Sequence, residues 1–230
     1  MTESNIWFLE NIDAHGIFCP KKLGNDTGTH IHTTYNKGEF AFKQADIADN
    51  IYYITSGRVK IGTEGDGDKS VTKAILSAGE IFGEKVMVGE TLRRDFAIAL
   101  EQTEVCIISK SEMSNLLIDR NPLSLLIMKI IGSRALKMEK RLESLVFKDS
   151  RSRIIEFLVD LNKEKGQRVG YEWVVRKFMT HQEIANLTAT SRQTVTTVLN
   201  ELKSMEIITF NRKRLLIRDI DQLSQQIASA

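Results

Sequence analysis

The sequence predicts an α+β protein in which an antiparallel β-rich part comes first, a long helix follows, and helices with a final hairpin end the chain. Three observations predict this order. From about Thr29 to Ser109, short apolar stretches rich in β-branched and aromatic residues alternate with turn signals such as "NKGEF" and "SAGE". From Leu123 to about Phe147, apolar residues recur at helical spacing with no breaker except Gly132. Further amphipathic segments then precede the hairpin sequence "IITFNRKRLLIRD".

The composition of the 230 residues sets only loose bounds. The start "MTESNIWFLE" has no basic stretch before an apolar run, and no apolar run approaches the length of a membrane span. The two cysteines, Cys19 and Cys106, are too few for a disulfide framework, so we expect a reducing, cytoplasmic location. From Asp149 onward, 13 Lys and Arg stand against 10 Asp and Glu, the sign expected if this part meets phosphates.

The long helix carries a heptad seam. Its apolar positions follow at spacings of 3, 4, 3, 4 and 3, and they are Met128, Ile131, Ala135, Met138, Leu142 and Leu145. This spacing predicts a parallel homodimer in which Arg134 pairs with Glu139 of the partner subunit. The alternative is a core helix packed on its own sheet, and Ile127, Ile130 and Leu136 indicate such a flank. The stretch "SRALKMEKRLES", with apolar residues almost only on the seam, favours the dimer.

The C-terminal part has the element order of a winged helix-turn-helix. The helix "RIIEFLVDLNKEKG", the β-like "YEWVVRKF", the helix "THQEIANLTA" and a helix capped by Ser191 precede the basic hairpin. The exposed face of the last helix carries an arginine, an amide and hydroxyls, and the hairpin turn carries three cations. The predicted DNA contacts are therefore Ser191, Arg192, Gln193, Thr196, Thr197, Arg212, Lys213 and Arg214. The alternative is an ordinary pair of packed helices with a solvated surface.

Several segments in this order resemble the CRP/FNR family of bacterial transcription regulators. They are "NIYYITSGRVKI", "AGEIFGE", "LVFKDSRSRIIEFL" and "HQEIANLTATSRQTVTTVLNELK". The resemblance implies a β-roll sensor domain (a double-stranded β-helix, cyclic-nucleotide-binding-like) over 1–120, a dimerisation helix over 121–148 and a winged helix-turn-helix over 149–230. It also implies double-stranded DNA and RNA polymerase as partners. In the family, bases are touched at positions that match Arg192, Gln193 and Thr197.

The resemblance also implies where an effector would bind. Members that bind cyclic AMP use a Gly-Glu pair, an Arg-Ser pair and a Thr-Ser pair. The corresponding candidate residues are Gly83 and Glu84, Arg94 and Asp95, and Met138 and Glu139. Only the first pair is intact, and the carboxylate of Asp95 would repel a phosphate. We therefore expect no cyclic AMP bound in the usual way, although another small anion could occupy the site, and the effector is unidentified.

Other cofactors and catalysis find little support in the sequence. An iron–sulfur cluster would need an N-terminal cysteine cluster where only Cys19 stands, and haem would need an axial His or Cys. His30 and His32 alternate, and His15 precedes Cys19, but no further metal ligands accompany them. No nucleophile–base pair appears, so we expect no enzyme, no haem, no iron–sulfur cluster and no other metal. The alternatives that stay open are a cyclic-nucleotide sensor with a degenerate DNA-binding part and an enzyme on a cupin-like barrel.

Overall fold

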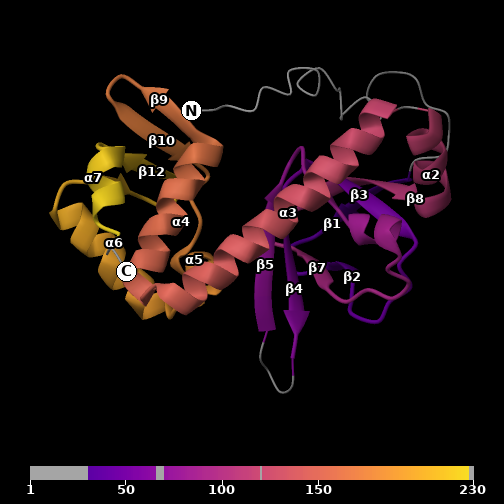
Figure 1. The fold of residues 1–230 in the computed structure, drawn as a ribbon, viewed down its shortest axis with the longest axis horizontal. Coiled ribbons are helices and arrows are strands. Elements are labelled where there is room, and N and C mark those ends of the chain that lie inside the picture. Colours follow the sequence, from indigo (N-terminus) through magenta and orange to yellow (C-terminus); the bar gives the residue numbers. More distant parts are fainter. Residues whose placement is uncertain (1–30, 66–69, 120, 228–230) are drawn as a thin grey trace. The chain divides into compact units, whose positions relative to one another are not determined.

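A computed structural model describes residues 31–65, 70–119 and 121–227. The chain divides between Ala135 and Leu136 into two compact units, and helix α3 (Asn121–Phe147) runs from one into the other (Figure 1). The predicted long helix is therefore confirmed, and the division falls inside it. The three expected domain ranges remain predictions. None of the helices among the described residues is long and apolar enough to cross a membrane.

The N-terminal unit is a β-roll of two four-stranded sheets in which every strand pair is antiparallel, as the sequence predicts. One sheet has the order β1 (Ile31–Tyr35), β8 (Thr103–Ser109), β3 (Asn50–Ser56) and β6 (Ile81–Phe82). The other has the order β2 (Phe40–Phe42), β7 (Phe96–Ala99), β4 (Arg58–Glu64) and β5 (Ser70–Ser77).

Two hydrophobic clusters hold this unit together. One includes Phe42, Tyr52, Ile54, Val59, Phe82 and Val105, from strands of both sheets. The other packs α2 (Lys110–Asp119) and the first part of α3 against strand β3 through residues such as Met113, Leu123 and Ile51. The β3–β4 turn requires glycine at Gly57, because its φ is 87° and an added Cβ would lie 2.4 Å from Thr103 Oγ1.

The C-terminal unit packs helices on a four-stranded sheet of order β11-β12-β10-β9. Its elements are α4 (Ser150–Lys165), β9 (Gly166–Val169), β10 (Glu172–Arg176), α5 (His181–Thr188), α6 (Arg192–Ser204), β11 (Ile208–Phe210), β12 (Arg214–Ile217) and α7 (Ile220–Gln225) (Figure 1). The predicted order of helix, strand, two helices and hairpin is confirmed. Strand β9 and helix α7 are additions that the sequence patterns did not reveal.

The helices of this unit begin where their capping residues stand. The Asp149 side chain accepts a hydrogen bond from Ser152 N at 2.8 Å, and Thr180 forms a capping box with Glu183. The apolar faces of α4, α5 and α6 then meet in one core that includes Ile154, Leu158, Ile184, Val195, Leu199 and Ile217. This core fixes α5 and α6 in position, and the exposed faces of both helices point away from it.

Candidate functional site

Helix α6 presents the residues that the sequence predicts to touch DNA. Ser191 caps it, since its side chain accepts from Thr194 N at 3.0 Å. The stripe of Val195, Val198, Leu199 and Leu202 is buried, so the opposite face is turned outward. On that face Arg192, Gln193 and Thr197 are all exposed. This face of α6 therefore presents a guanidinium, an amide, and a threonine methyl and hydroxyl group to a ligand that binds along the helix.

Thr196 differs from the expectation of an outward hydroxyl. Its Oγ1 donates to Arg192 O at 2.9 Å and lies 2.8 Å from Nδ1 of His181, the first residue of α5. The ring of His181 also makes an edge contact with Phe210, at 5.7 Å between centroids. Burial, and next the positive charge of Arg192, lower the pKa of His181. Thr196 therefore joins α5 to α6, and its hydroxyl is engaged within the protein.

The turn between α5 and α6 is fixed by contacts from α4. Ala189 has a positive φ of 51°, and Thr190 N donates to Ala185 O at 2.9 Å. The guanidinium of Arg153 donates to the carbonyls of Thr188 and Ala189, at 3.0 and 3.1 Å. Sequence reasoning missed Arg153, because its partners lie 35 and 36 residues away. Arg153 thus holds α6 at a set angle to the rest of the unit.

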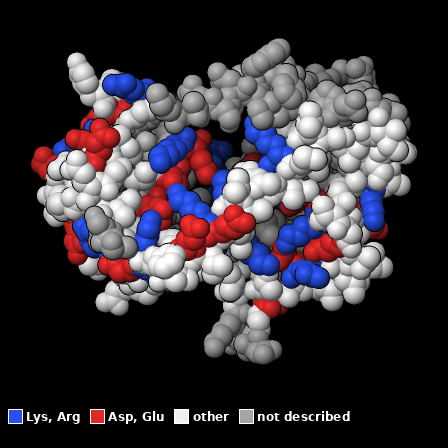
Figure 2. Space-filling model, in the orientation of Figure 1, with Lys and Arg blue, Asp and Glu red and all other residues white. Residues whose placement is uncertain are grey.

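The hairpin turn between β11 and β12 is pinned by Asn211. Its backbone N donates to Arg214 O at 2.9 Å, and its Oδ1 accepts from Lys213 N and Arg214 N at 2.8 and 3.0 Å. Arg212, Lys213 and Arg214 are all exposed, as predicted. Figure 2 shows both signs of charge interspersed on the face that it draws. The three neighbouring cations of the turn, and not the net charge of the protein, therefore indicate a site for anions.

The β-roll places Gly83 and Glu84 together at the start of a short helix, η3 (Glu84–Val88), with Gly83 at a positive φ of 79°. The carboxylate of Glu84 is buried and pairs with Arg134 of α3, which also donates to Ile81 O. The structure therefore gives Arg134 a partner in its own chain, in place of the Glu139 of a second chain that the heptad pattern predicts. The ion pair of Glu84 with Arg134 therefore connects α3 to the β-roll at Glu84, which is one of the residues expected to hold an effector.

Asp95 is buried in a cluster of cations. Its carboxylate accepts from Lys73, Lys85 and Thr63, the last at 2.8 Å. Burial raises the pKa of Asp95, but hydrogen bonds from the two lysines and the threonine outweigh burial, so the pKa lies below its usual value. The carboxylate is thus charged at neutral pH and already occupies the anion position that these lysines offer.

The structure distinguishes Arg94 from its neighbour Arg93, and a role of Arg94 at the effector remains a prediction. Arg94 is exposed, whereas Arg93 is buried and donates to Gly83 O at 3.0 Å and to Asn50 O at 2.5 Å. The guanidinium of Arg93 also lies 4.3 Å from the centroid of Phe42, and its Nε has no hydrogen-bond partner among the described residues. Sequence reasoning did not single out Arg93, because its contacts join residues 10 and 43 positions apart in the chain.

The remaining candidates of the sensor and the seam lie along α3. Met138 and Glu139 belong to the C-terminal unit and are exposed in the single chain, so their role at an effector remains a prediction. Of the seam residues, Met128, Met138, Leu142 and Leu145 are 69, 47, 64 and 41 % exposed, Ala135 is exposed and Ile131 is partly buried. Such exposure contradicts a core helix over this stretch and leaves an apolar stripe for a second copy.

Metal ligands do not gather in the part of the chain that the structure describes, where no three His, Cys, Asp or Glu side chains converge. His32 is exposed on β1, with Nδ1 3.4 Å from Sγ of Cys106. The other candidates, His15, Cys19 and His30, lie outside the described residues.

Comparison with known families matches both parts of the chain. Residues 32–120 match the model of the cyclic nucleotide-binding domain. Residues 152–226 match the model of the Crp-like helix-turn-helix domain. The two models fall on the β-roll and on the winged helix-turn-helix, respectively.

Relatives of known role cover nearly the whole chain. A global nitrogen regulator of Synechocystis sp. is 26% identical over 208 residues, covering 90% of this chain and 92% of the relative. A cyclic AMP receptor protein of Thermus thermophilus is 29% identical over 212 residues, covering 92% and 94%. The structure of a mutant of CooA from Carboxydothermus hydrogenoformans has a TM-score of 0.78 at 26% identity, covering 99% of this chain and 98% of that one. FixK2 from Bradyrhizobium japonicum shares the fold, with a TM-score of 0.75 at 18% identity and coverage of 87% and 98%.

Proposed function

Because the chain belongs to the CRP/FNR family of transcription regulators, we propose that it acts as a homodimer that binds an inverted repeat in double-stranded DNA. The proposal includes control by an effector held in the β-roll and contact with RNA polymerase. A regulator of transcription works where the chromosome is, so we place it in the cytoplasm. We assign it no catalytic activity.

One observation carries the DNA-binding part of the proposal. The exposed side chains of Arg192, Gln193 and Thr197 lie on one face of α6, and α5 and α4 hold that helix through His181 and Arg153. A guanidinium can pair with O6 and N7 of guanine, and an amide with N6 and N7 of adenine. We infer that Arg192 selects a guanine and Gln193 an adenine in each half-site.

The apolar stripe on α3 supports the dimer. Two copies of α6 related by a two-fold axis contact half-sites whose centres lie about one helical turn, roughly 34 Å, apart. The bond between Glu84 and Arg134 supports control through α3, because an effector that binds Glu84 competes with a side chain of that helix. The identity of the effector is open, and its chemistry must suit a site that already contains the charged carboxylate of Asp95.

Selection of duplexes from a random pool tests the DNA-binding proposal. The wild-type protein should enrich an inverted repeat with a guanine in each half. Arg192→Ala should lose preference at that guanine and cost about 1–3 kcal/mol per half-site, because a bidentate pair is removed.

The matched control is Arg168→Ala, which removes an exposed cation of β9 in the same unit and should leave the preference unchanged. Enrichment of sequences without a two-fold repeat would contradict the dimeric mode. Unaltered base preference in Arg192→Ala would contradict the role of α6.

A further inference from the structure

We propose that Cys106, on strand β8, forms a reversible disulfide with Cys19 and that this pair exchanges with low-molecular-weight thiols and disulfides such as glutathione. The chain has only these two cysteines, too few for a disulfide framework. The structure nevertheless places the sulfur of Cys106 in a disulfide bond. Cys19 lies outside the described residues, so the count of cysteines identifies it as the partner. This redox site goes beyond the binding of DNA and of an effector.

The cellular setting of a transcription regulator indicates what kind of disulfide this is. Cytosolic thiols keep most cysteines reduced, and the disulfides found there are usually transient, either catalytic or redox-sensing. No catalytic activity is assigned to this protein. A disulfide that forms and breaks with the redox state of its surroundings is therefore the form that suits it.

The sheet register places Cys106 in the interior of the β-roll. Strand β8 lies between β1 and β3, and Cys106 is directly opposite His32 on one side and Tyr53 on the other. Residues directly opposite each other in paired strands lie on the same face of the sheet. Cys106 is 0% exposed. Its sulfur is therefore shielded from direct attack by a thiol in solution.

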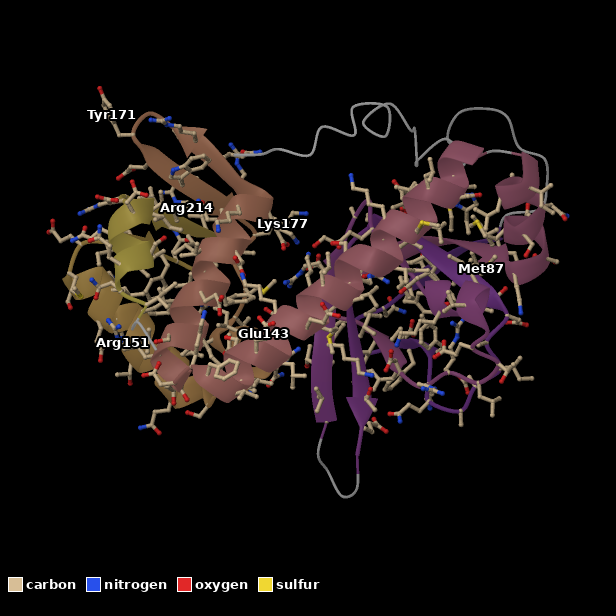
Figure 3. All side chains as sticks on the ribbon, in the orientation of Figure 1. Met87, Glu143, Arg151, Tyr171, Lys177 and Arg214 are labelled. Carbon is tan, nitrogen blue, oxygen red and sulfur yellow. The ribbon has the colours of Figure 1, made fainter. Side chains whose placement is uncertain are left out.

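The same face of the sheet supports the start of helix α3. Cys106 belongs to the hydrophobic cluster that includes Met113 of α2 and both Leu123 and Ile127 of α3. Met87 of η3 also packs against this cluster (Figure 3). A disulfide at Cys106 thus attaches the N-terminal segment to the cluster on which the first part of α3 rests.

His32 supplies the polar contact that the exchange reaction needs. Its Nδ1 lies 3.4 Å and its Nε2 3.8 Å from Sγ of Cys106. A sulfur in a disulfide carries no proton, so the imidazole N–H is the donor of this contact. His32 is exposed although Cys106 is buried. An N–H donor stabilises a departing thiolate, and the exposed ring connects the buried sulfur to protons of the solvent.

Reduction proceeds in two exchange steps. A thiolate of glutathione attacks the sulfur of Cys19, the bond between the two cysteine sulfurs breaks, and Cys106 leaves as a thiolate that takes up a proton beside His32. A second glutathione thiolate then attacks the mixed disulfide, and Cys19 leaves as a thiolate and is protonated. The protein gains two electrons and two protons, and two molecules of glutathione become one glutathione disulfide. Oxidation follows the same steps in reverse.

The test equilibrates the full-length protein in glutathione buffers that range from reduced to oxidised. Alkylation with N-ethylmaleimide under native conditions, followed by mass spectrometry, should add two groups to the reduced protein and none to the oxidised protein. Digestion without reductant should release a peptide in which Cys19 is linked to Cys106. The oxidised form should melt higher than the reduced form by roughly 4–16 °C, the shift that one disulfide typically gives in a chain of this length.

Hydrogen exchange tests the connection to α3. Amides of residues 123–131 should exchange faster in the reduced protein than in the oxidised protein, because the cluster beneath them loses its covalent attachment. Amides of α6, in the core of the other unit, serve as the internal control and should exchange equally in both forms. Equal exchange of residues 123–131 in the two forms would contradict the connection.

Two variants control for effects unrelated to the bond. Cys19→Ser should melt like the reduced wild type in every buffer. Cys106→Ala, which places no hydroxyl in the core, should do the same. A disulfide that survives reduced glutathione until the protein is denatured would overturn reversibility. Alkylation of both cysteines in every buffer, or a linked peptide that joins two chains, would overturn the pair itself. None of these measurements involves DNA, so their outcome is independent of the proposed function.

Discussion

At the scale of single residues, the β-roll contains a buried charged carboxylate, that of Asp95. It is bonded to Lys73, Lys85 and Thr63, and these bonds keep it charged although it is buried. A residue whose pKa is lowered in the folded state stabilises that state above its unfolded pKa, about 3.9. This contribution is lost as the pH falls through the lowered folded pKa.

Asp95→Asn should therefore destabilise the protein at pH 7 and much less at an acidic pH below the lowered folded pKa of Asp95, where the wild-type carboxyl has also lost its charge. Removing one partner leaves two lysines without a counter-charge. Because both lysines are partly exposed, we expect a loss of about 1–3 kcal/mol in the free energy of unfolding, less than for a fully buried pair. Urea titrations at the two pH values measure it. An equal loss at both would contradict an electrostatic origin.

At the scale of elements, α3 carries the dimer prediction. Met138 and Leu142 are 47 and 64 % exposed in the single chain, on the predicted seam. Replacing both with Glu puts charges where two helices should bury apolar side chains worth about 1.5–3 kcal/mol each. The variant should sediment as a monomer and lose specific DNA binding.

The control for this prediction uses the same helix. Leu136 and Phe147 are 67 and 69 % exposed, and at about 100° per residue they lie on the side of α3 opposite to Met138 and Leu142. Leu136→Glu/Phe147→Glu should remain dimeric. If this variant also becomes monomeric, or if Met138→Glu/Leu142→Glu stays dimeric, the interface is not the heptad seam.

The second part of α3 also binds the C-terminal unit. Lys137 pairs with Glu164 at 2.9 Å, Lys148 pairs with Glu156 at 2.9 Å, and Arg141 donates to Asn186 O at 3.0 Å. The first part of α3 is bonded to the sensor unit through Arg134 and Glu84. One helix therefore carries contacts to both units as well as the apolar stripe.

At the scale of the whole molecule, the β-roll matches the model of the cyclic nucleotide-binding domain over residues 32–120. Glu84 is paired with Arg134, and Asp95 is a buried carboxylate paired with Lys73 and Lys85. We expect titration calorimetry with cyclic AMP to show weak binding or none, because a phosphate would meet the charged carboxylate. Asp95→Ser should bind anions better than the wild type. Tight binding of cyclic AMP by the wild type would contradict this expectation.

The sequence by itself determined the features that depend on neighbours along the chain. The cap Ser191, the buried stripe of α6 and the cations of the wing turn follow from side-chain type and from periods of 2 and 3.6 residues. The α+β order and the family were predictable for the same reason. Each of these features depends on a few neighbouring residues, so it can be predicted without knowledge of the fold.

Only the tertiary structure decided which distant residues meet. It selected Arg93 over Arg94 at Gly83, turned the Thr196 hydroxyl toward His181, paired Arg134 with Glu84, and set Arg176 opposite Arg214. Each of these contacts depends on strand register or on the angle between helices. A shift of one residue would exchange the buried and exposed sides of a strand. The strand register and the helix angles are set by the packing of the whole core, so they cannot be predicted from a local sequence pattern.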